Sequence, residues 1–534
     1  MEDNKKRATA IFFALLVFIT VLFVATRMYR LDIVPFGAHI VHIDELGAAY
    51  DAICIADYGV DQFQLRMPVY FKCFGESQDA LYTYLAAIAF KLGGVSIFTY
   101  RLPAVICAVA AFAALFFLIR DLLDKWYALA ALALMTIMPV FMMSEHWGLQ
   151  CFLQISTTII AFCFQVKAVK EDRSLYWFLA GTFWGITLYT YVMAYVIVPI
   201  FLLLTMVVLL KFRKLSLKNA VLAVIPLMIL GVPLLIQQLV MMDYLQPFSF
   251  FGLIDFWPPH HTRYHLMSAE YVVENLLMSF KYTYVADRSA YDANPVFGTM
   301  YYVSIPFILI GMVTSAVAVI KDLKAKILNP WIFNWMYFLV CRAFFLFVQY
   351  PNVNRINGIY PAYLLFAVYG IKAVVSRINK MTVRVVFLVV VCVAYGISFV
   401  LFSKYFYKHD GLQTHAFAEG DGLAVDVEAG EAAALAKTIA NGKPVVAMVN
   451  DGYYRHMAFA LYTETSPYEY FRDHEPRDRY YNGVDWHMPD GLDLSGDTVY
   501  LIDAELLHIT QYLQTEGFAV DITYPDFTVV YKDV

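Results

Sequence analysis

The sequence is poor in charge for its size. Only 16% of its 534 residues are Asp, Glu, Lys or Arg, whereas 61% are apolar and 17% are aromatic. Water-soluble globular proteins carry roughly a quarter charged residues and about half apolar ones. This deficit of charge excludes a nucleic-acid binder, a disordered chain and a protein that is soluble as a whole.

Cysteine is also scarce, with seven residues in the chain and none after Cys392. Most of them fall in or beside long apolar runs, where a free cysteine behaves as a small hydrophobic residue. The odd count and the cysteine-free C-terminal region exclude a disulfide framework. Only Cys54 and Cys73 share one polar segment, and the sequence leaves open whether they pair.

Long apolar runs, by contrast, fill the first 400 positions. A helix needs about 20 apolar residues to cross a bilayer. We predict eleven spans on this basis, at residues 9–27, 101–119, 126–143, 150–167, 174–192, 193–210, 219–238, 300–320, 330–349, 358–376 and 383–403. The first apolar run lacks a small-x-small cleavage site, so we expect an uncleaved span rather than a secretory signal.

The basic residues indicate which side of the membrane each loop faces. The short loops on one side of the predicted spans hold 19 Lys and Arg, and short basic loops face the cytoplasm. Residues 1–403 carry a net charge of +8, against −13 for residues 404–534. We therefore predict a cell-membrane protein with a cytoplasmic N-terminus, a membrane body over 1–403 and an extracytoplasmic domain over 404–534.

The region after residue 403 has the pattern of a small α/β domain. Residues 431–437 and 504–514 favour helices, and residues 444–449, 498–502 and 527–531 favour strands. This order predicts helices packed on a small, mainly parallel sheet.

The first outer segment, at about 28–100, contains the adjacent carboxylates Asp44 and Glu45. Acidic side chains this close to a bilayer are costly unless they face water, a cation or a substrate. An apolar run at 80–90 is too short for a span, and we expect a helix at the outer interface with Tyr82 as an interfacial aromatic residue. A second long outer segment covers about 239–299.

Eleven basic residues of the membrane body lie outside the cytoplasmic loops. Several will be anchors whose charged ends reach the interface. Guanidinium groups match phosphate oxygens with paired donors, so Arg101, Arg355 and Arg342 are candidate phosphate clamps. Lys72 is a further candidate, and the loop around Arg355 also holds Asn352 and Asn354.

Two polar clusters remain on the predicted outer side. Glu145 and His146 form an acid/base pair after the third span, and Arg263 lies in the second long outer segment. His261 and His265 are four residues apart, a spacing that brings two metal ligands together on a helix. Pro258-Pro259 weakens a helix here, so the sequence leaves open whether a divalent metal binds and assigns no certain cofactor.

At these residues the chain resembles the GT-C fold glycosyltransferases, in the family-39-like group related to protein O-mannosyltransferases and the aminoarabinose transferase of lipid A. The motifs are Asp44-Glu45, Leu81-Tyr82, Arg101-Leu102-Pro103 and Asn354-Arg355 with the following Pro361. They cover about residues 8–403 in the family's order. Relatives often have Lys-Pro-Pro before the Leu-Tyr, where this chain has Gln78-Asp79-Ala80, so that lysine contact is not carried over.

The resemblance implies a polytopic α-helical membrane enzyme, of bacterial origin, that uses a polyprenyl-phosphate sugar donor. The sugar would pass to a hydroxyl of a glycan, lipid or protein acceptor at the outer face, with inversion. Asp44 would be the general base, and Glu45 would orient the acceptor or a metal. A donor or acceptor pocket would then include Glu145, His146, Tyr82, Asn352, Asn354 and Arg263.

Two alternatives stay open. A lipid-linked sugar flippase or transporter would suit the many spans and an arginine inside one of them, but the sequence has no matched halves or broken-helix repeat. A polymer ligase or polymerase would share the lipid-phosphate leaving group and differ only in the size of its donor.

Overall fold

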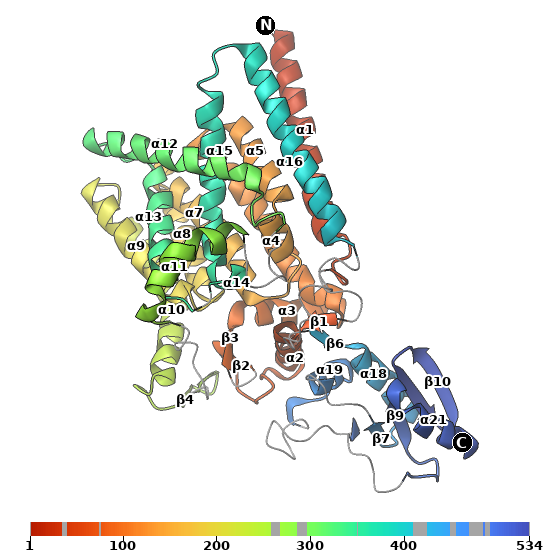
Figure 1. Cartoon of the computed structure of the whole chain (residues 1–534). Coiled ribbons are helices and arrows are strands. Elements are labelled where there is room, and N and C mark those ends of the chain that lie inside the picture. Colours follow the sequence, from red (N-terminus) through yellow and green to blue (C-terminus); the bar gives the residue numbers. More distant parts are fainter. Residues whose placement is uncertain are drawn as a thin grey trace.

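A computed structural model describes residues 2–34, 40–73, 76–257, 267–285, 296–349, 351–408, 424–448, 455–468, 484–485 and 492–532. A helical bundle forms one end of the molecule and a smaller α/β domain the other (Figure 1). The bundle's helices are α1 (Glu2–Met28), α2 (Ile43–Tyr58), α3 (Ala80–Gly93), α4 (Ile97–Leu122), α5 (Lys125–Ile137), α6 (Pro139–Ser144), α7 (Leu153–Glu171), α8 (Ser174–Leu188), α9 (Ala194–Lys211), α10 (Leu217–Met241), α11 (Val272–Phe280), α12 (Ile305–Lys324), α13 (Trp331–Phe345), α14 (Val353–Ile356), α15 (Tyr360–Val375) and α16 (Met381–Phe406).

Among the described residues, eight helices are long and apolar enough to cross a membrane, and each coincides with a predicted span: α1, α4, α7, α9, α10, α12, α15 and α16. The chain is therefore a multi-pass membrane protein. The other three predicted spans coincide with shorter helices, namely α5, α8 and α13. Span 126–143 is interrupted at Met138, which is extended, because Pro139 cannot continue a helix and begins a new one.

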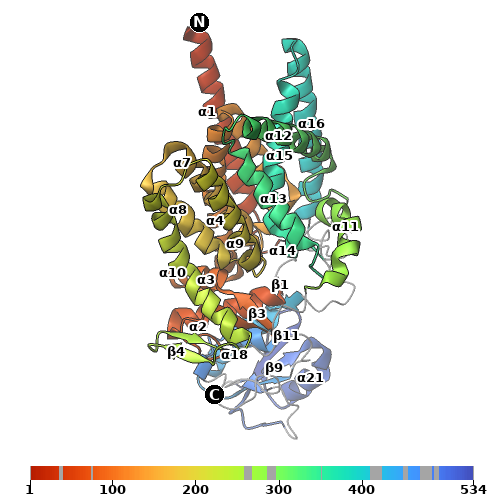
Figure 2. The same cartoon turned by 90° about the vertical axis from the view of Figure 1, so that its left-hand side faces the viewer.

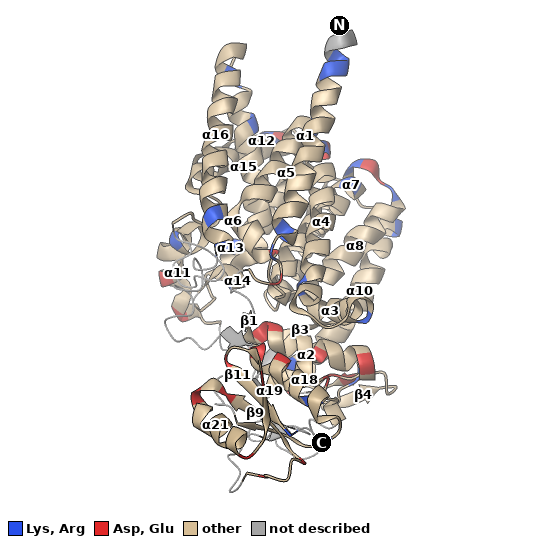
Figure 3. Cartoon of the chain, turned by 90° about the vertical axis from the view of Figure 1, so that its right-hand side faces the viewer, with Lys and Arg blue, Asp and Glu red and all other residues tan. Residues whose placement is uncertain are grey.

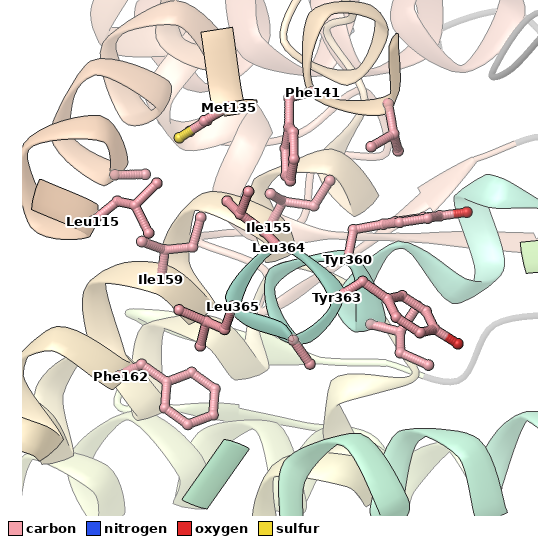
Figure 4. Packing of buried hydrophobic residues seen from close by; sticks show 14 of the residues in the cluster. Leu115, Met135, Phe141, Ile155, Ile159, Phe162, Tyr360, Tyr363, Leu364 and Leu365 are labelled. Carbon is pink, nitrogen blue, oxygen red and sulfur yellow. The ribbon is translucent and has the colours of Figure 1, made fainter. Parts of the chain in front are cut away.

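The centre of the bundle is formed by α7 and α15, whose residues are almost all buried (Figure 4). Figure 1 shows α12 crossing α15 at a steep angle. Glycines make this crossing close: a Cβ on Gly311 would lie 1.8 Å from the Phe366 carbonyl oxygen, and one on Gly370 would lie 1.8 Å from that of Phe307. Small residues permit this backbone approach in membrane helices.

The predicted interfacial helix at 80–90 is present as α3. It has 14 residues, fewer than the roughly 20 needed to span a bilayer. It follows an antiparallel hairpin of β2 (Tyr70–Cys73) and β3 (Glu76–Asp79). A second hairpin, β4 (Phe248–Phe250) and β5 (Ile254–Phe256), follows α10.

The C-terminal region contains the predicted helices and strands. The predicted elements are α18 (Glu428–Ala440), β7 (Val445–Met448), β9 (Val499–Asp503), α21 (Leu507–Thr515) and β11 (Phe527–Tyr531). The structure adds β6 (Ala424–Asp426), α19 (Arg455–Tyr462), β8 (Val484–Asp485) and β10 (Ala519–Tyr524), which were not predicted. The sheet order is β10-β11-β9-β7-β8. The prediction of a mainly parallel sheet was wrong, because β10 and β11 form a tight hairpin and β11 pairs antiparallel to β9.

Charge is distributed unevenly along the molecule. The ribbon of Figure 3, coloured by residue type, shows acidic residues in α2 and the C-terminal domain, and basic residues at the beginning of α1. The orientation of the chain in the membrane stays a prediction.

Candidate active site around Asp44

Asp44 and Glu45 lie at the N-terminus of α2. The short strand β1 (Ile40–His42) leads directly into this helix. The His42 side chain accepts a hydrogen bond from the Asp44 backbone N–H (3.1 Å), and the Glu45 carboxylate accepts one from the His42 backbone N–H (3.2 Å). This reciprocal cap fixes the first turn, where the helix dipole favours negative charge.

Glu45 is buried and held by four hydrogen bonds. Arg101 donates to both of its carboxylate oxygens, from Nε (2.8 Å) and from Nη2 (2.7 Å), and the Gly148 N–H donates at 2.7 Å. The fourth donor is the His42 N–H already described. Burial raises the pKa of Glu45, but the charge and hydrogen bonds of Arg101 and the two backbone donors outweigh it, so the pKa is lowered overall. Glu45 thus holds α2 to α4 as an ion.

Arg101 is fully buried in the same cluster. Its remaining donors bind the backbone oxygens of Leu31 (3.1 Å) and Val34 (2.9 Å). Gly148 is required beside it, because a Cβ there would lie 2.1 Å from the Tyr100 ring and 2.9 Å from the Glu45 carboxylate. The predicted pair of a catalytic Glu45 and a phosphate-binding Arg101 is, in the structure, one ion pair inside the protein.

Asp44 is the more open member of the acidic pair. Its side chain is 31% exposed, compared with 1% for Glu45, and lies 3.8 Å from Nδ1 of His42. Burial lowers the pKa of His42, although the charges of Asp44 and Glu45 oppose the shift, so the imidazole is neutral and its Nδ1 accepts. The Asp44 backbone oxygen accepts a hydrogen bond from the Gln78 amide at 3.1 Å.

Glu145 and His146 do not line an open surface. Arg27 is completely buried and donates to Glu145 at 2.5 Å and to the Met135 carbonyl at 2.8 Å. Burial raises the pKa of Glu145 to about 6 and lowers that of His146 to about 3. The buried His146 contacts the Met142 backbone oxygen, so the predicted acceptor-side role of this pair does not match its position. Arg27 stands out in the sequence only as an arginine near the end of the first span.

The other predicted phosphate clamps lie in neighbouring segments. The Asn352 side chain caps α14 by accepting from the Arg355 N–H (3.0 Å), and the Arg355 guanidinium donates to the Gln349 carbonyl. Arg342, on α13, donates to the Thr283 hydroxyl at 3.1 Å. Arg342 lines a small pocket together with Pro351, which precedes α14, and Ile356, the last residue of α14. The side chains of Arg342, Asn352, Asn354 and Arg355 are half-buried.

Some of the remaining predicted residues have described positions, and others lie outside the described residues. Tyr82 is buried and donates to the Tyr100 carbonyl at 2.8 Å, so it belongs to the core. Lys72 lies with its ammonium 4.4 Å from the centre of the Phe63 ring. Cys54 is a free, buried cysteine. Arg263, His261 and His265 lie outside the described residues, and the described part of the chain contains no group of three metal-binding side chains.

An apolar groove runs along α8, α9 and α10, which lie together on one side of the bundle (Figure 2). It encloses about 570 Å³ and is lined mainly by aliphatic residues. Tyr195 lines the groove and donates from its hydroxyl to Asp79 at the start of α3. Gln78, the neighbour of Asp79, contacts Asp44, so a chain of contacts joins the groove to the acidic pair.

Comparisons with known proteins agree with this architecture. The sequence model of dolichyl-phosphate-mannose-protein mannosyltransferase matches residues 79–236, and no curated protein sequence matches the chain. The crystal structure of ArnT from Cupriavidus metallidurans in the apo state has a TM-score of 0.50 at 12% identity, over 99% of this chain and 98% of that one. The same protein bound to undecaprenyl phosphate gives 0.51 at 12% identity, over 98% of each chain.

The apo oligosaccharyltransferase of Archaeoglobus fulgidus is also similar, with a TM-score of 0.50 and 12% identity over 84% of this chain and 63% of that one. These matches confirm the predicted GT-C fold. At this level of identity they establish the fold alone.

Proposed function

We propose that this protein transfers a sugar from a polyprenyl-phosphate-linked donor to an acceptor hydroxyl at the outer face of the membrane. The observation that carries the proposal is the contrast between the two neighbouring carboxylates. Glu45 forms a buried ion pair, whereas Asp44 beside it is partly exposed. A fixed, accessible carboxylate is what a general base requires.

In the proposed reaction, Asp44 takes the proton of the acceptor hydroxyl while that oxygen bonds to the anomeric carbon. The bond from this carbon to the phosphate oxygen breaks, and the electron pair leaves with the polyprenyl phosphate. A single displacement of this kind inverts the anomeric centre. Cations near the departing phosphate stabilise its growing negative charge more than they stabilise the bound donor.

The groove along α8, α9 and α10 supports the assignment of the donor. Its aliphatic lining suits a polyprenyl chain, and hydrophobic stabilisation grows with buried apolar area at about 25 cal/mol per Å². The contacts through Tyr195, Asp79 and Gln78 lead from the groove towards Asp44. We propose that the prenyl chain lies in the groove and the sugar phosphate lies near Asp44.

Arg355 and Arg342 are the proposed phosphate contacts, with Lys72 as a third. Asn352 would position Arg355 through the α14 cap. We assign Arg101 to holding Glu45, because its donors face a carboxylate and backbone oxygens. Glu145 and His146 are assigned to packing. Arg263, Asn354 and a divalent metal at His261 and His265 stay predictions, as do the cytoplasmic N-terminus and the extracytoplasmic C-terminal domain.

The direct test is to incubate the purified protein with a panel of polyprenyl-phosphate sugars. We expect release of polyprenyl phosphate together with transfer of the sugar or its hydrolysis. Movement of the intact donor across vesicles without cleavage would instead support a flippase. Activity restricted to lipid-linked oligosaccharides would support a ligase or polymerase.

A further inference from the structure

The strand that leads into Asp44 is paired with the C-terminal domain. Within the described residues, β1 has one strand partner, β6, with Ile40 opposite Asp426, Val41 opposite Val425 and His42 opposite Ala424. Figure 1 shows the two strands side by side at the junction of the bundle and the domain. A three-residue strand has no stability of its own, so the backbone before Asp44 depends on residues almost 400 positions later.

The C-terminal domain also packs against the helix that carries Asp44. Val41, Ile43 and Leu46 belong to one buried cluster with Val427 and Leu461. Further along α2, the buried Tyr50 hydroxyl donates to the Thr465 carbonyl at 3.0 Å. The strand before Asp44 therefore pairs with residues 424–426, and the helix that carries Asp44 contacts Val427, Leu461 and Thr465.

The membrane body holds the same turn through different atoms. Glu45 is bound by Arg101 from α4 and by the backbone of Gly148. Asp44 lies between these two supports, and its own carboxylate takes part in neither the β1–β6 pairing nor the Glu45–Arg101 ion pair.

We propose that β6 and the described residues that follow it, 427–448 and 455–468, form a positioning element for Asp44 that acts through the backbone of β6. The inference rests on the proposed function, since Asp44 is the general base there. Displacing a catalytic group by about 1 Å lowers turnover by roughly 100-fold. The aliphatic residues that would hold the prenyl chain lie on α8, α9 and α10, which a shift of the backbone before Asp44 leaves in place. Loss of β6 pairing is therefore expected to lower kcat and to leave donor binding intact.

The test uses the full-length protein with Ala424→Pro and Val425→Pro. Adjacent N–H groups on a strand point to opposite edges, so one of the two substitutions removes a β1–β6 hydrogen bond. Ile522→Pro is the matched control, because Ile522 is 74% exposed on the edge strand β10 of the same domain. The readouts are kcat, KM for the donor, and the number of undecaprenyl phosphate sites per molecule.

We expect at least one of the two β6 variants to lose about tenfold or more in kcat. Its KM and binding stoichiometry should stay within about twofold of wild type, as should every value for Ile522→Pro. Wild-type kcat in both β6 variants would overturn the proposal. So would a parallel loss of kcat and binding sites, which indicates unfolding rather than misplacement.

Amide hydrogen exchange separates this inference from the proposed function. Residues 40–46 should exchange faster in at least one of the two β6 variants than in wild type, and where the wild type is active this is the variant with reduced kcat. If the wild-type protein cleaves no polyprenyl-phosphate sugar but this exchange still rises, the proposed function fails and the strand coupling stands. Unchanged exchange at 40–46 in both variants would refute the coupling itself.

Discussion

Polar side chains are frequent and paired around Asp44, whereas they are few in the groove along α8, α9 and α10. Around Asp44, buried charges are paired and bonded to backbone, as in Glu45–Arg101 and Arg27–Glu145. The groove is lined by aliphatic residues with few polar groups, such as Gln165, which accepts from the Trp184 indole. A rigid polar frame suits catalysis, whereas an apolar groove suits binding of a lipid chain. The two regions are joined near Tyr195.

Asp44→Asn should have the strongest effect of all the variants, and it should lower turnover without changing donor binding. Asp44→Asn removes the proposed base and should lower kcat by about 10²–10⁴-fold, the range that general base catalysis contributes. Binding of undecaprenyl phosphate should not change, because the groove is intact. Single-turnover assays and binding measurements on one preparation check both statements, and wild-type turnover in the variant would eliminate Asp44 as the base.

The neighbouring carboxylate should behave differently. Glu45→Ala leaves Arg101 buried without its partner, which destabilises a protein by about 3–5 kcal/mol. We expect a lower thermal unfolding temperature in detergent and loss of both turnover and donor binding. Asp44→Ala is the control, since a partly exposed side chain can be removed with little loss of stability. Equal unfolding temperatures for the two variants would contradict the assigned roles.

Filling the groove should affect binding alone. Leu202 lines the groove on α9, whereas Val207 on the same helix is 55% exposed and lies outside its lining. Leu202→Trp should weaken undecaprenyl phosphate binding by about tenfold, or about 1.4 kcal/mol. Val207→Trp should bind like wild type. Equal affinity in the two variants would place the lipid elsewhere.

The smallest effect concerns two buried carboxyls, Asp51 in the middle of α2 and Asp61 just after its end. Burial, with the nearby Asp61, raises the pKa of Asp51 well above its ordinary value, and burial raises that of Asp61 to about 7. Carboxyls of this kind ionise at about pH 4 when unfolded. The protonated forms therefore stabilise the fold fully below about pH 4, and this contribution is lost as the pH rises through about 7.

Asp61→Asn should thus raise the unfolding temperature at pH 8 relative to wild type, by a few degrees, and should have less effect at pH 5. Its amide oxygen can still accept from the Phe63 and Leu65 N–H groups, which bind Asp61 at 2.8 Å. Thermal unfolding at the two pH values measures the difference. A shift of the same size at both would show that ionisation of this pair does not limit stability.

The membrane architecture could be predicted from the sequence because its signal is local. Among the described residues, eight of the eleven predicted spans match helices long enough to cross a membrane, and the other three match shorter helices. The order of the motifs indicated the fold. The sequence analysis did not predict the break at Pro139 or the antiparallel β10–β11 hairpin. Each depends on a single turn, which the pattern of apolar residues does not reveal.

The roles of individual charges could not be predicted in this way. Arg101 and Arg355 look alike in the sequence, yet one is buried against Glu45 and the other is half-buried at the end of α14. Which partner a charge meets depends on contacts such as Gly148 with Glu45, across 103 positions. Strands β1 and β6 are still farther apart in the sequence, and no local pattern indicates that they pair.

We propose that one lipid-linked donor occupies the groove with its phosphate near Asp44. Photocrosslinking of the purified protein with undecaprenyl phosphate that carries a diazirine on its chain tests this most directly. We predict labelling of α9 and α10 residues that line the groove, such as Leu202, Met206 and Leu235, abolished by excess unlabelled undecaprenyl phosphate. If the labelling that excess undecaprenyl phosphate abolishes is concentrated on α1 and α16 instead, the lipid does not lie in this groove.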